Sequence, residues 1–216
     1  MSKESDRRPI AARSSGWAKA LTSILVQAGI TPNQISVVSV VVATAGAVLF
    51  FFACSSAWQR SLCLLGAAAC IQLRLLCNML DGMVAVEGGK QSKTGALFNE
   101  LPDRLADSLF LVLSGFAAQS GDLGIELGWA AALLAVLTAY IRAFGASQGL
   151  KQDFCGPMAK QHRMFTLTVA SVLGAVETAT GSPPRIITAA LTIVVAGSII
   201  TCFRRTKHIF ISLRQN

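Results

Sequence analysis

Apolar segments long enough to cross a lipid bilayer recur along the chain, and this repetition constrains the fold more than any other feature of the sequence. A run of about 18 or more predominantly apolar residues is typical of a transmembrane helix. Inside a bilayer only helices and closed barrels satisfy every backbone hydrogen bond. The 216 residues are 53% hydrophobic and only 14% charged, which is unusual for a soluble domain. We therefore predict an all-α, polytopic membrane protein with six transmembrane helices, at about residues 33–54, 60–84, 95–119, 127–149, 164–180 and 185–203.

The segment before the first span has a different pattern. Between residues 13 and 28, the side chains of Trp17, Leu21 and Ile24 fall on one helix face, and the basic side chains lie off it. This pattern predicts an amphipathic interfacial helix anchored by tryptophan, and an ordinary helix of the bundle is the alternative. Thr31 followed by Pro32 is typical of a helix start. We expect a tail and interfacial helix at 1–30, a six-span domain at 31–205 and a C-terminal tail at 206–216.

The basic residues predict the orientation of the chain in the membrane. Fourteen of the nineteen Lys and Arg residues fall in the N-terminal segment, the 84–94 and 150–163 loops and the C-terminal tail. Loops with excess Lys and Arg face the cytoplasm, so we expect an inner-membrane protein with both termini cytoplasmic. The net charge of +8 then indicates contact with anionic lipid. We expect no nucleic-acid partner, because no aromatic residues are interleaved with the basic ones.

Polar residues interrupt the second and third spans at helical spacing. Asn78 and Asp81 are three residues apart and share a helix face. A charged side chain at mid-bilayer costs roughly 2.5–3.5 kcal/mol, so these stripes should face a water-filled cavity or a bound cation. The alternative is that they lie at solvated helix ends. A second set steps by four residues and lines one face of the next helix: Gly95, Asn99, Asp103 and Asp107.

Carboxylates and amides that converge from two helices suit a hard cation such as Mg²⁺ or Mn²⁺. No His or Cys joins these stripes, which disfavours zinc. Cys63, Cys70 and Cys77 repeat every seven residues along one helix face, where we expect them to act as small apolar residues, and we expect no metal or redox role for the six cysteines. Gly82 and Gly95 leave room for a bulky ligand beside the backbone. A divalent cation with basic residues at a membrane surface points to phosphoryl or phosphatidyl transfer, and a cation-coupled transporter is the alternative. Three basic residues on the same side could hold a phosphate: Arg142, Lys160 and Arg163.

The spacing of these residues resembles the signature of the CDP-alcohol phosphatidyltransferases, D-x2-D-G-x2-A-R-x8-G-x3-D-x3-D. Every interval of the signature is kept, and the six-span layout and amphipathic N-terminal helix are also similar to the family. The aligned string reads Asn78-x2-Asp81-Gly82-x2-Ala85-Val86-x8-Gly95-x3-Asn99-x3-Asp103.

The resemblance implies transfer of a phosphatidyl or related group from CDP-diacylglycerol or another CDP-alcohol to a small polar alcohol, with release of CMP. In the family the first three aspartates hold a divalent pair and the last acts as a base. Asp81 is therefore similar to a metal ligand and Asp103 to the general base. The resemblance also implies a homodimer. Donor-binding positions would be Gly82, Ala85, Gly95, Lys90 and Lys93.

Three positions depart from the signature. Asn78 and Asn99 stand at the first and third aspartates, and Val86 stands at the arginine. An asparagine offers a carbonyl oxygen but no charge. Glu100 or Asp107 would replace the lost carboxylates, or one metal would suffice; an inactive family member that binds CDP-lipid or serves as an assembly subunit is the alternative. By the same resemblance Arg142, Lys160 and Arg163 would hold the phosphate of a phosphorylated acceptor, or else act as ordinary membrane-surface cations.

Overall fold

The structure is a computed structural model, and it describes residues 15–53, 57–89 and 95–215, apart from the side chains of residues 96, 98 and 99. The described residues form helices and no strand, so the predicted all-α class is confirmed. Seven helices follow one another along the chain: α1 (Gly16–Gln27), α2 (Pro32–Phe52), α3 (Ala57–Glu87), α4 (Gly95–Ala117), α5 (Asp122–Ser147), α6 (Lys160–Ala179) and α7 (Ile186–Gln215).

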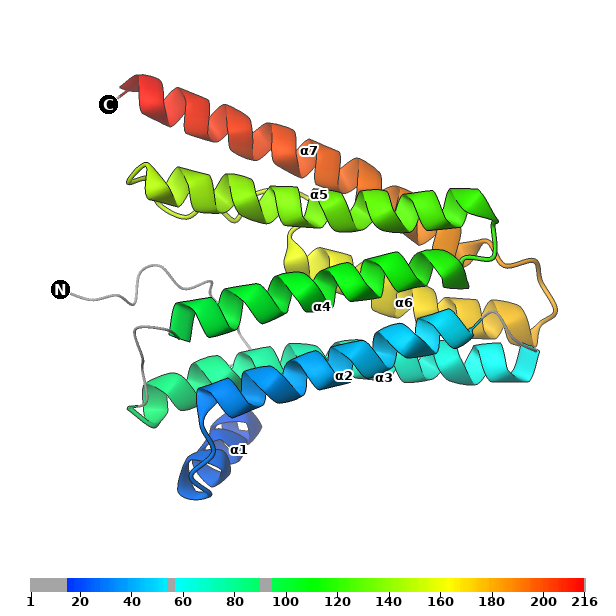
Figure 1. The fold of residues 1–216 in the computed structure, drawn as a ribbon, viewed down its shortest axis with the longest axis horizontal. Helices are drawn as coiled ribbons and strands as arrows, with labels where there is room; N and C mark the ends of the chain where they lie inside the picture. Colours follow the sequence, from blue (N-terminus) through cyan, green and yellow to red (C-terminus); the bar gives the residue numbers. More distant parts are fainter. Residues whose placement is uncertain (1–14, 54–56, 90–94, 216) are drawn as a thin grey trace.

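Helices α2 to α7 run lengthwise through one bundle, and α1 lies beside the start of α2 (Figure 1). In this bundle α2 packs against α3 and α4, α4 against α5, α3 against α6, and α5 against α7. Helix α6 begins part-way along the bundle, because the segment after α5 first runs back beside the helices (Figure 1). The late start of α6 carries its first residues into the interior of the bundle.

Four helices, α2, α3, α5 and α7, are long and apolar enough to cross a membrane. Large apolar side chains such as Val41, Leu133 and Phe203 are exposed on the outside of the bundle, as expected for a surface that faces lipid. The chain is therefore a polytopic membrane protein. Helices α4 and α6 have 23 and 20 residues but carry charged side chains in their interiors, and the expected count of six spans stays a prediction.

The predicted helix boundaries differ from the observed ones mainly at the C-terminus. The Thr31 hydroxyl caps α2 by accepting a hydrogen bond from the Gln34 amide, with Pro32 at the first position, as predicted. Helix α7 does not end near residue 203 but continues to Gln215. This extension packs on α5, where Ile209 contacts Gly145 and the Arg205 guanidinium donates to the Thr138 carbonyl oxygen at 2.7 Å. Most of the expected tail at 206–216 is thus helical.

Glycines bring α4 and α5 into backbone contact. A Cβ atom added at Gly128 would lie 2.9 Å from the carbonyl oxygens of Leu111 and Val112, and 3.1 Å from the Cα atom of Gly115. Small residues at such positions let membrane helices approach closely. This contact sets the position of α4, which carries Asp103 and Asp107.

We expect Gly128→Ala to lower the free energy of unfolding by about 1–3 kcal/mol, because backbone atoms cannot move aside for the added methyl group. Thermal unfolding of the detergent-solubilised protein measures the change. Gly16→Ala is the matched control, since nothing lies within 4 Å of a Cβ atom at that position. Equal midpoints for the two variants would contradict the close contact of α4 and α5.

Candidate functional site

The two predicted polar stripes meet in the interior of the bundle. Helices α3 and α4 present them to each other, and α2 and α6 close the remaining sides. We call the charged and amide groups gathered there the polar cluster; its members are Arg74, Asn78, Asp81, Asp103, Asp107, Lys160 and Arg163.

Arg74 lies at the centre of the polar cluster, and its side chain is fully buried. Its Nη2 atom is 3.0 Å from Asp103 Oδ1 and 2.9 Å from Asp107 Oδ1, and it also donates to the Asp103 carbonyl oxygen at 3.1 Å. Position 74 is one helical turn before Asn78, so this arginine and the α3 polar stripe share a face. A buried guanidinium between two carboxylates compensates charge that would otherwise be costly in a membrane interior.

Asp103 is enclosed by donors from two other helices. Its Oδ1 atom accepts from Arg74 and from the side-chain amide of Asn78, and its Oδ2 atom accepts from the Lys160 ammonium. Lys160 is the first residue of α6, and it reaches Asp103 because α6 begins inside the bundle. Both side chains keep some exposure, 20% for Lys160 and 10% for Asp103. Asp103, which the family resemblance implies as the general base, therefore forms an ion pair with Lys160 that solvent can reach.

Asp107 and Arg163 form a second ion pair whose two side chains are almost fully buried. Arg163 Nη2 is 3.6 Å from Asp107 Oδ2, and each side chain is 1% exposed. The Nη1 atom of Arg163 donates to the Met158 carbonyl oxygen at 2.6 Å and to the Thr138 hydroxyl at 3.3 Å. Arg163, which lies on α6, is thus bonded both to α5 and to the segment before α6.

Asp81 and Asn78 face α2. The Ser36 hydroxyl donates to Asp81 Oδ2 at 3.0 Å, and the Ser39 hydroxyl donates to the Asn78 carbonyl oxygen at 3.2 Å. The second carboxylate oxygen of Asp81 is buried without a hydrogen-bond partner among the described residues. Asp81 is thus the one aspartate of the polar cluster with no ion pair in the described part of the chain.

Asp81 and Asn78 are the members of the polar cluster whose chemistry suits a Mg²⁺ or Mn²⁺ ion, since each has an oxygen atom that is not in an ion pair. A second ion would need Asp103 or Asp107, which already pair with Arg74, Lys160 and Arg163. The acids and bases of the polar cluster are equal in number, so Arg74 supplies positive charge where a second metal ion would otherwise be needed.

The predicted metal ligand Glu100 pairs with arginines outside the polar cluster. Glu100 is 48% exposed, and its Oε1 atom is 2.6 Å from Arg104 Nη2 and 2.7 Å from Arg142 Nη2. This carboxylate therefore joins α4 to α5 and does not replace a carboxylate of the polar cluster. The side chain of Asn99 lies outside the described residues.

The predicted donor-binding residues are described only in part. Gly82 and Ala85 are half-buried on α3, in the turn that follows Asp81, and Gly95 is the first residue of α4. Lys90 and Lys93 lie outside the described residues. The donor-binding assignment stays a prediction.

The three predicted phosphate-binding cations do not share one site. Arg142 donates to Gln152 at 3.1 Å and lies over the ring of Phe154, whereas Lys160 and Arg163 bond within the polar cluster. Arg142 instead lines an open cavity of about 530 Å³ between α5, α7 and the segment after α5, together with Lys151 and Arg205. The cavity carries three basic side chains, and Arg205 and Lys151 were not predicted from sequence as members of a site.

Sequence reasoning also missed Arg74, Ser36 and Ser39. The sequence did contain a signal for Arg74, because a charged residue one turn from Asn78 in an apolar span needs a partner of opposite charge. Ser36 and Ser39 lie three residues apart in the apolar α2, but short hydroxyl side chains are common in membrane helices and bond their own backbone, so this signal is weak.

Comparison with known proteins decides the family. The family model described as CDP-alcohol phosphatidyltransferase matches residues 29–203. The chain belongs to the CDP-alcohol phosphatidyltransferase family. Its matched region contains α2 to α6, all of the polar cluster and α7 as far as residue 203.

The individual relatives of this chain are distant. The phosphatidylinositol phosphate synthase of Streptomyces avermitilis is 25% identical over 189 residues, which cover 85% of this chain and 73% of that protein. The Mycobacterium tuberculosis phosphatidylinositol phosphate synthase with CDP-DAG bound aligns with a TM-score of 0.76 at 19% identity, over 91% of this chain and 94% of that one. The same synthase in complex with manganese and citrate aligns with a TM-score of 0.74 at 20% identity, over 89% and 88%. At this identity the structural matches establish a shared fold.

We expect Arg74→Met to lower the free energy of unfolding by about 3–5 kcal/mol, because it leaves two carboxylates buried without their shared partner. Thermal unfolding in detergent measures the loss. Arg104→Gln is the matched control, since this arginine pairs with a half-exposed glutamate, and its loss should cost less than about 1 kcal/mol. Similar losses for the two variants would show that the central ion pairs do not support the bundle.

Proposed function

We propose that the chain transfers a phosphatidyl or related group from CDP-diacylglycerol, or another CDP-alcohol, to a hydroxyl group of a small polar alcohol. The acceptor oxygen forms a bond to the β-phosphorus of the donor, the bond to the CMP oxygen breaks, and CMP leaves. The family match over residues 29–203 supports this reaction class, and the observation that carries it is the buried polar cluster with Asp81 and Asp103.

Asp81 and Asn78 are the residues that would hold a Mg²⁺ or Mn²⁺ ion, since they offer the oxygen atoms that are not in ion pairs. Such an ion neutralises diphosphate charge and polarises the bond to the leaving group. Ser36 and Ser39 orient the two ligands from α2. Arg74 holds Asp103 and Asp107 in place and adds a permanent positive charge behind the site.

Asp103 would act as the general base for the acceptor hydroxyl, and Lys160 would control when it does so. A carboxylate that accepts charge-assisted bonds from two cations is a weak base, because both bonds favour its ionised form. A phosphate on the acceptor would compete for the Lys160 ammonium and draw it from Asp103 Oδ2. The freed oxygen could then accept the hydroxyl proton, so that the base becomes available when a phosphorylated acceptor is bound.

The proposed acceptor is therefore a phosphorylated polar alcohol. Two features support this choice: Lys160 forms an ion pair with the proposed base, and Arg142, Lys151 and Arg205 line the open cavity between α5, α7 and the segment that leads to Lys160. Arg163, being 1% exposed and bonded to Met158 and Thr138, is proposed as a structural cation and not as a phosphate ligand. We further propose an inner-membrane protein with both termini toward the cytoplasm, which the distribution of basic residues supports. A homodimer is proposed from the family membership.

A second candidate function is a non-catalytic relative that binds a CDP-lipid. The observation that favours it is Asp103 itself, whose two oxygens are both in bonds with Arg74, Asn78 and Lys160. If no acceptor draws Lys160 away from Asp103, the polar cluster would hold the CDP-lipid donor without turnover. Binding of a CDP-lipid with no CMP release for any acceptor would support this second function.

The first test follows CMP release from CDP-diacylglycerol by the purified full chain with a panel of polar alcohols and their phosphates. We expect release that requires Mg²⁺ or Mn²⁺ and falls at least a hundred-fold in Asp103→Asn, because the amide cannot take the hydroxyl proton. Asp122→Asn is the control, since Asp122 is exposed at the opposite end of the bundle. Release that persists in EDTA or in Asp103→Asn would contradict the mechanism.

The second test concerns Lys160→Met. A hydrogen bond to a charged group contributes about 1.5–3 kcal/mol, so we expect KM for a phosphorylated acceptor to rise about 10-fold to 100-fold. The kcat for an acceptor without phosphate should stay equal or rise, because Asp103 loses one of its two cations. Steady-state kinetics with the two acceptor classes separates the effects. Equal losses for both classes would mean that Lys160 only supports the fold.

A further inference from the structure

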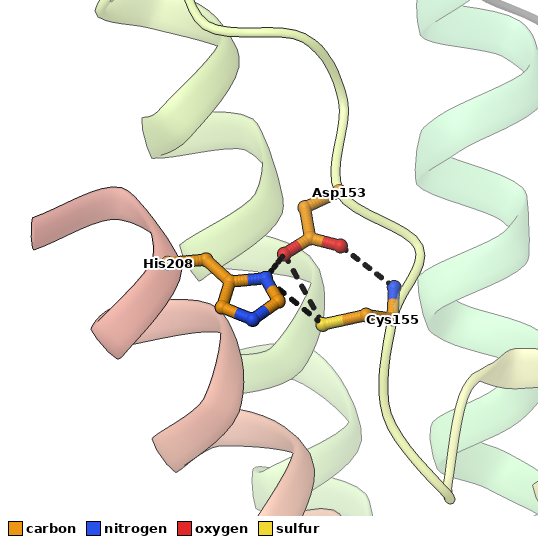
Figure 2. Close-up of side chains that lie close together, drawn as sticks. All are labelled: Asp153, Cys155 and His208. Atoms are coloured by element: carbon orange, nitrogen blue, oxygen red, sulfur yellow. Dashed lines mark hydrogen bonds and ion pairs between the residues drawn. The ribbon is translucent and has the colours of Figure 1, made fainter. Parts of the chain in front are cut away.

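A second group of metal-binding side chains lies outside the polar cluster, where the segment after α5 passes the C-terminal half of α7. Figure 2 shows Asp153 and Cys155 from this segment pointing toward His208 of α7. Cys155 Sγ is 3.1 Å from Asp153 Oδ2 and 3.6 Å from His208 Nδ1, and Asp153 Oδ2 is 3.0 Å from His208 Nδ1. One thiol, one imidazole and one carboxylate therefore present their donor atoms to a common point.

The backbone around these side chains is held firmly to α7. The Arg205 Nε atom donates to the Cys155 carbonyl oxygen at 3.0 Å, and the Met158 amide donates to the Thr201 hydroxyl at 3.0 Å. Gly156 has a φ of +115°, and a Cβ atom there would meet Thr201 at 2.5 Å. Asp153 Oδ1 in turn accepts from the Cys155 amide at 2.8 Å. The donor atoms are thus positioned by the scaffold before any ion binds.

The distances agree with one face of a tetrahedral zinc site. Zn²⁺ binds sulfur at about 2.3 Å and nitrogen or oxygen at about 2.0–2.2 Å, which places neighbouring ligand atoms roughly 3.3–3.6 Å apart. The observed separations of 3.0–3.6 Å need changes of only a few tenths of an ångström. A thiolate and an imidazole together select zinc-like ions over Mg²⁺ and Mn²⁺. This site and the polar cluster therefore differ in the ions that they favour.

The same surroundings disfavour a nucleophilic cysteine. Burial and the adjacent Asp153 carboxylate raise the pKa of the Cys155 thiol to about 11, whereas reactive cysteines have a lowered pKa. The expectation that cysteines act as apolar residues fits Cys63, Cys70 and Cys77 on α3 but does not account for Cys155.

We propose that Asp153, Cys155 and His208 bind one Zn²⁺ ion, with the fourth ligand supplied by water. The His208 side chain is 57% exposed, and both His208 and Asp153 line the open cavity of about 530 Å³, so water reaches the site. The bound ion ties the segment between α5 and α6 to α7. It thereby holds the wall of the cavity that carries Lys151 and Arg205, and the start of α6 that follows it in the chain.

The test uses Co²⁺ as a spectroscopic substitute for zinc on the full chain in detergent, after removal of metals with a chelator. We expect one thiolate-bound Co²⁺ per chain, with a thiolate-to-cobalt charge-transfer band and the visible absorption of a tetrahedral site, neither of which an oxygen-bound Co²⁺ at Asp81 would give. Cys155→Ser should abolish the charge-transfer band. Cys202→Ser is the matched control, because this half-buried cysteine lies on α7, the helix of His208, but outside the group, and it should keep the band.

A second measurement guards against misfolding of Cys155→Ser. A stoichiometric amount of Zn²⁺ should raise the unfolding temperature of the wild type and of Cys202→Ser, and His208→Gln should weaken Co²⁺ binding at least 10-fold. Asp81→Asn should leave the cobalt spectrum unchanged, which separates this site from the polar cluster. Absence of the charge-transfer band in the wild type at excess Co²⁺, or its persistence in Cys155→Ser, would overturn the proposal.

Discussion

The ion pairs of Arg74 with Asp103 and Asp107 are the interaction on which the rest of the site depends. A guanidinium and two carboxylates cannot each be buried alone in a bundle that faces lipid, so they determine how α3 and α4 are aligned. Arg163 extends the same compensation to α6, and Lys160 extends it to the accessible side of Asp103. Asp81, which has no ion pair among the described residues, is left as the position where a cation from solution can bind.

This arrangement suggests a physical role for Asn78, which the spacing of the sequence aligns with the first aspartate of the family signature. Asn78 keeps an oxygen toward α2 but turns its amide nitrogen toward Asp103, so it acts as a donor where a carboxylate would repel. The three acids of the polar cluster, Asp81, Asp103 and Asp107, are matched by the three cations Arg74, Lys160 and Arg163, so the formal charges of the polar cluster balance within the chain.

The segment between α5 and α6 links the polar cluster to the end of the bundle at which α5 ends. It runs back into the bundle before α6 begins, which places Lys160 and Arg163 at the depth of the acids (Figure 1). The same segment lines the open cavity beside Arg142 and carries Asp153 and Cys155 against α7. The proposed acceptor recognition, the proposed control of the base and the proposed zinc site thus all depend on one short stretch of chain and on the length of α7.

The sequence alone determined the helical class, the membrane location and the convergence of the acids of α3 and α4, because hydrophobic length and four-residue spacing follow directly from bilayer thickness and helix geometry. It could not determine which charges pair. Arg74 is 29 residues from Asp103, Lys160 is 57 residues from it, and Cys155 is 53 residues from His208, and no local pattern encodes such distances. Only the packing of the helices decided these partners, since a buried charge selects whichever opposite charge the fold brings within reach.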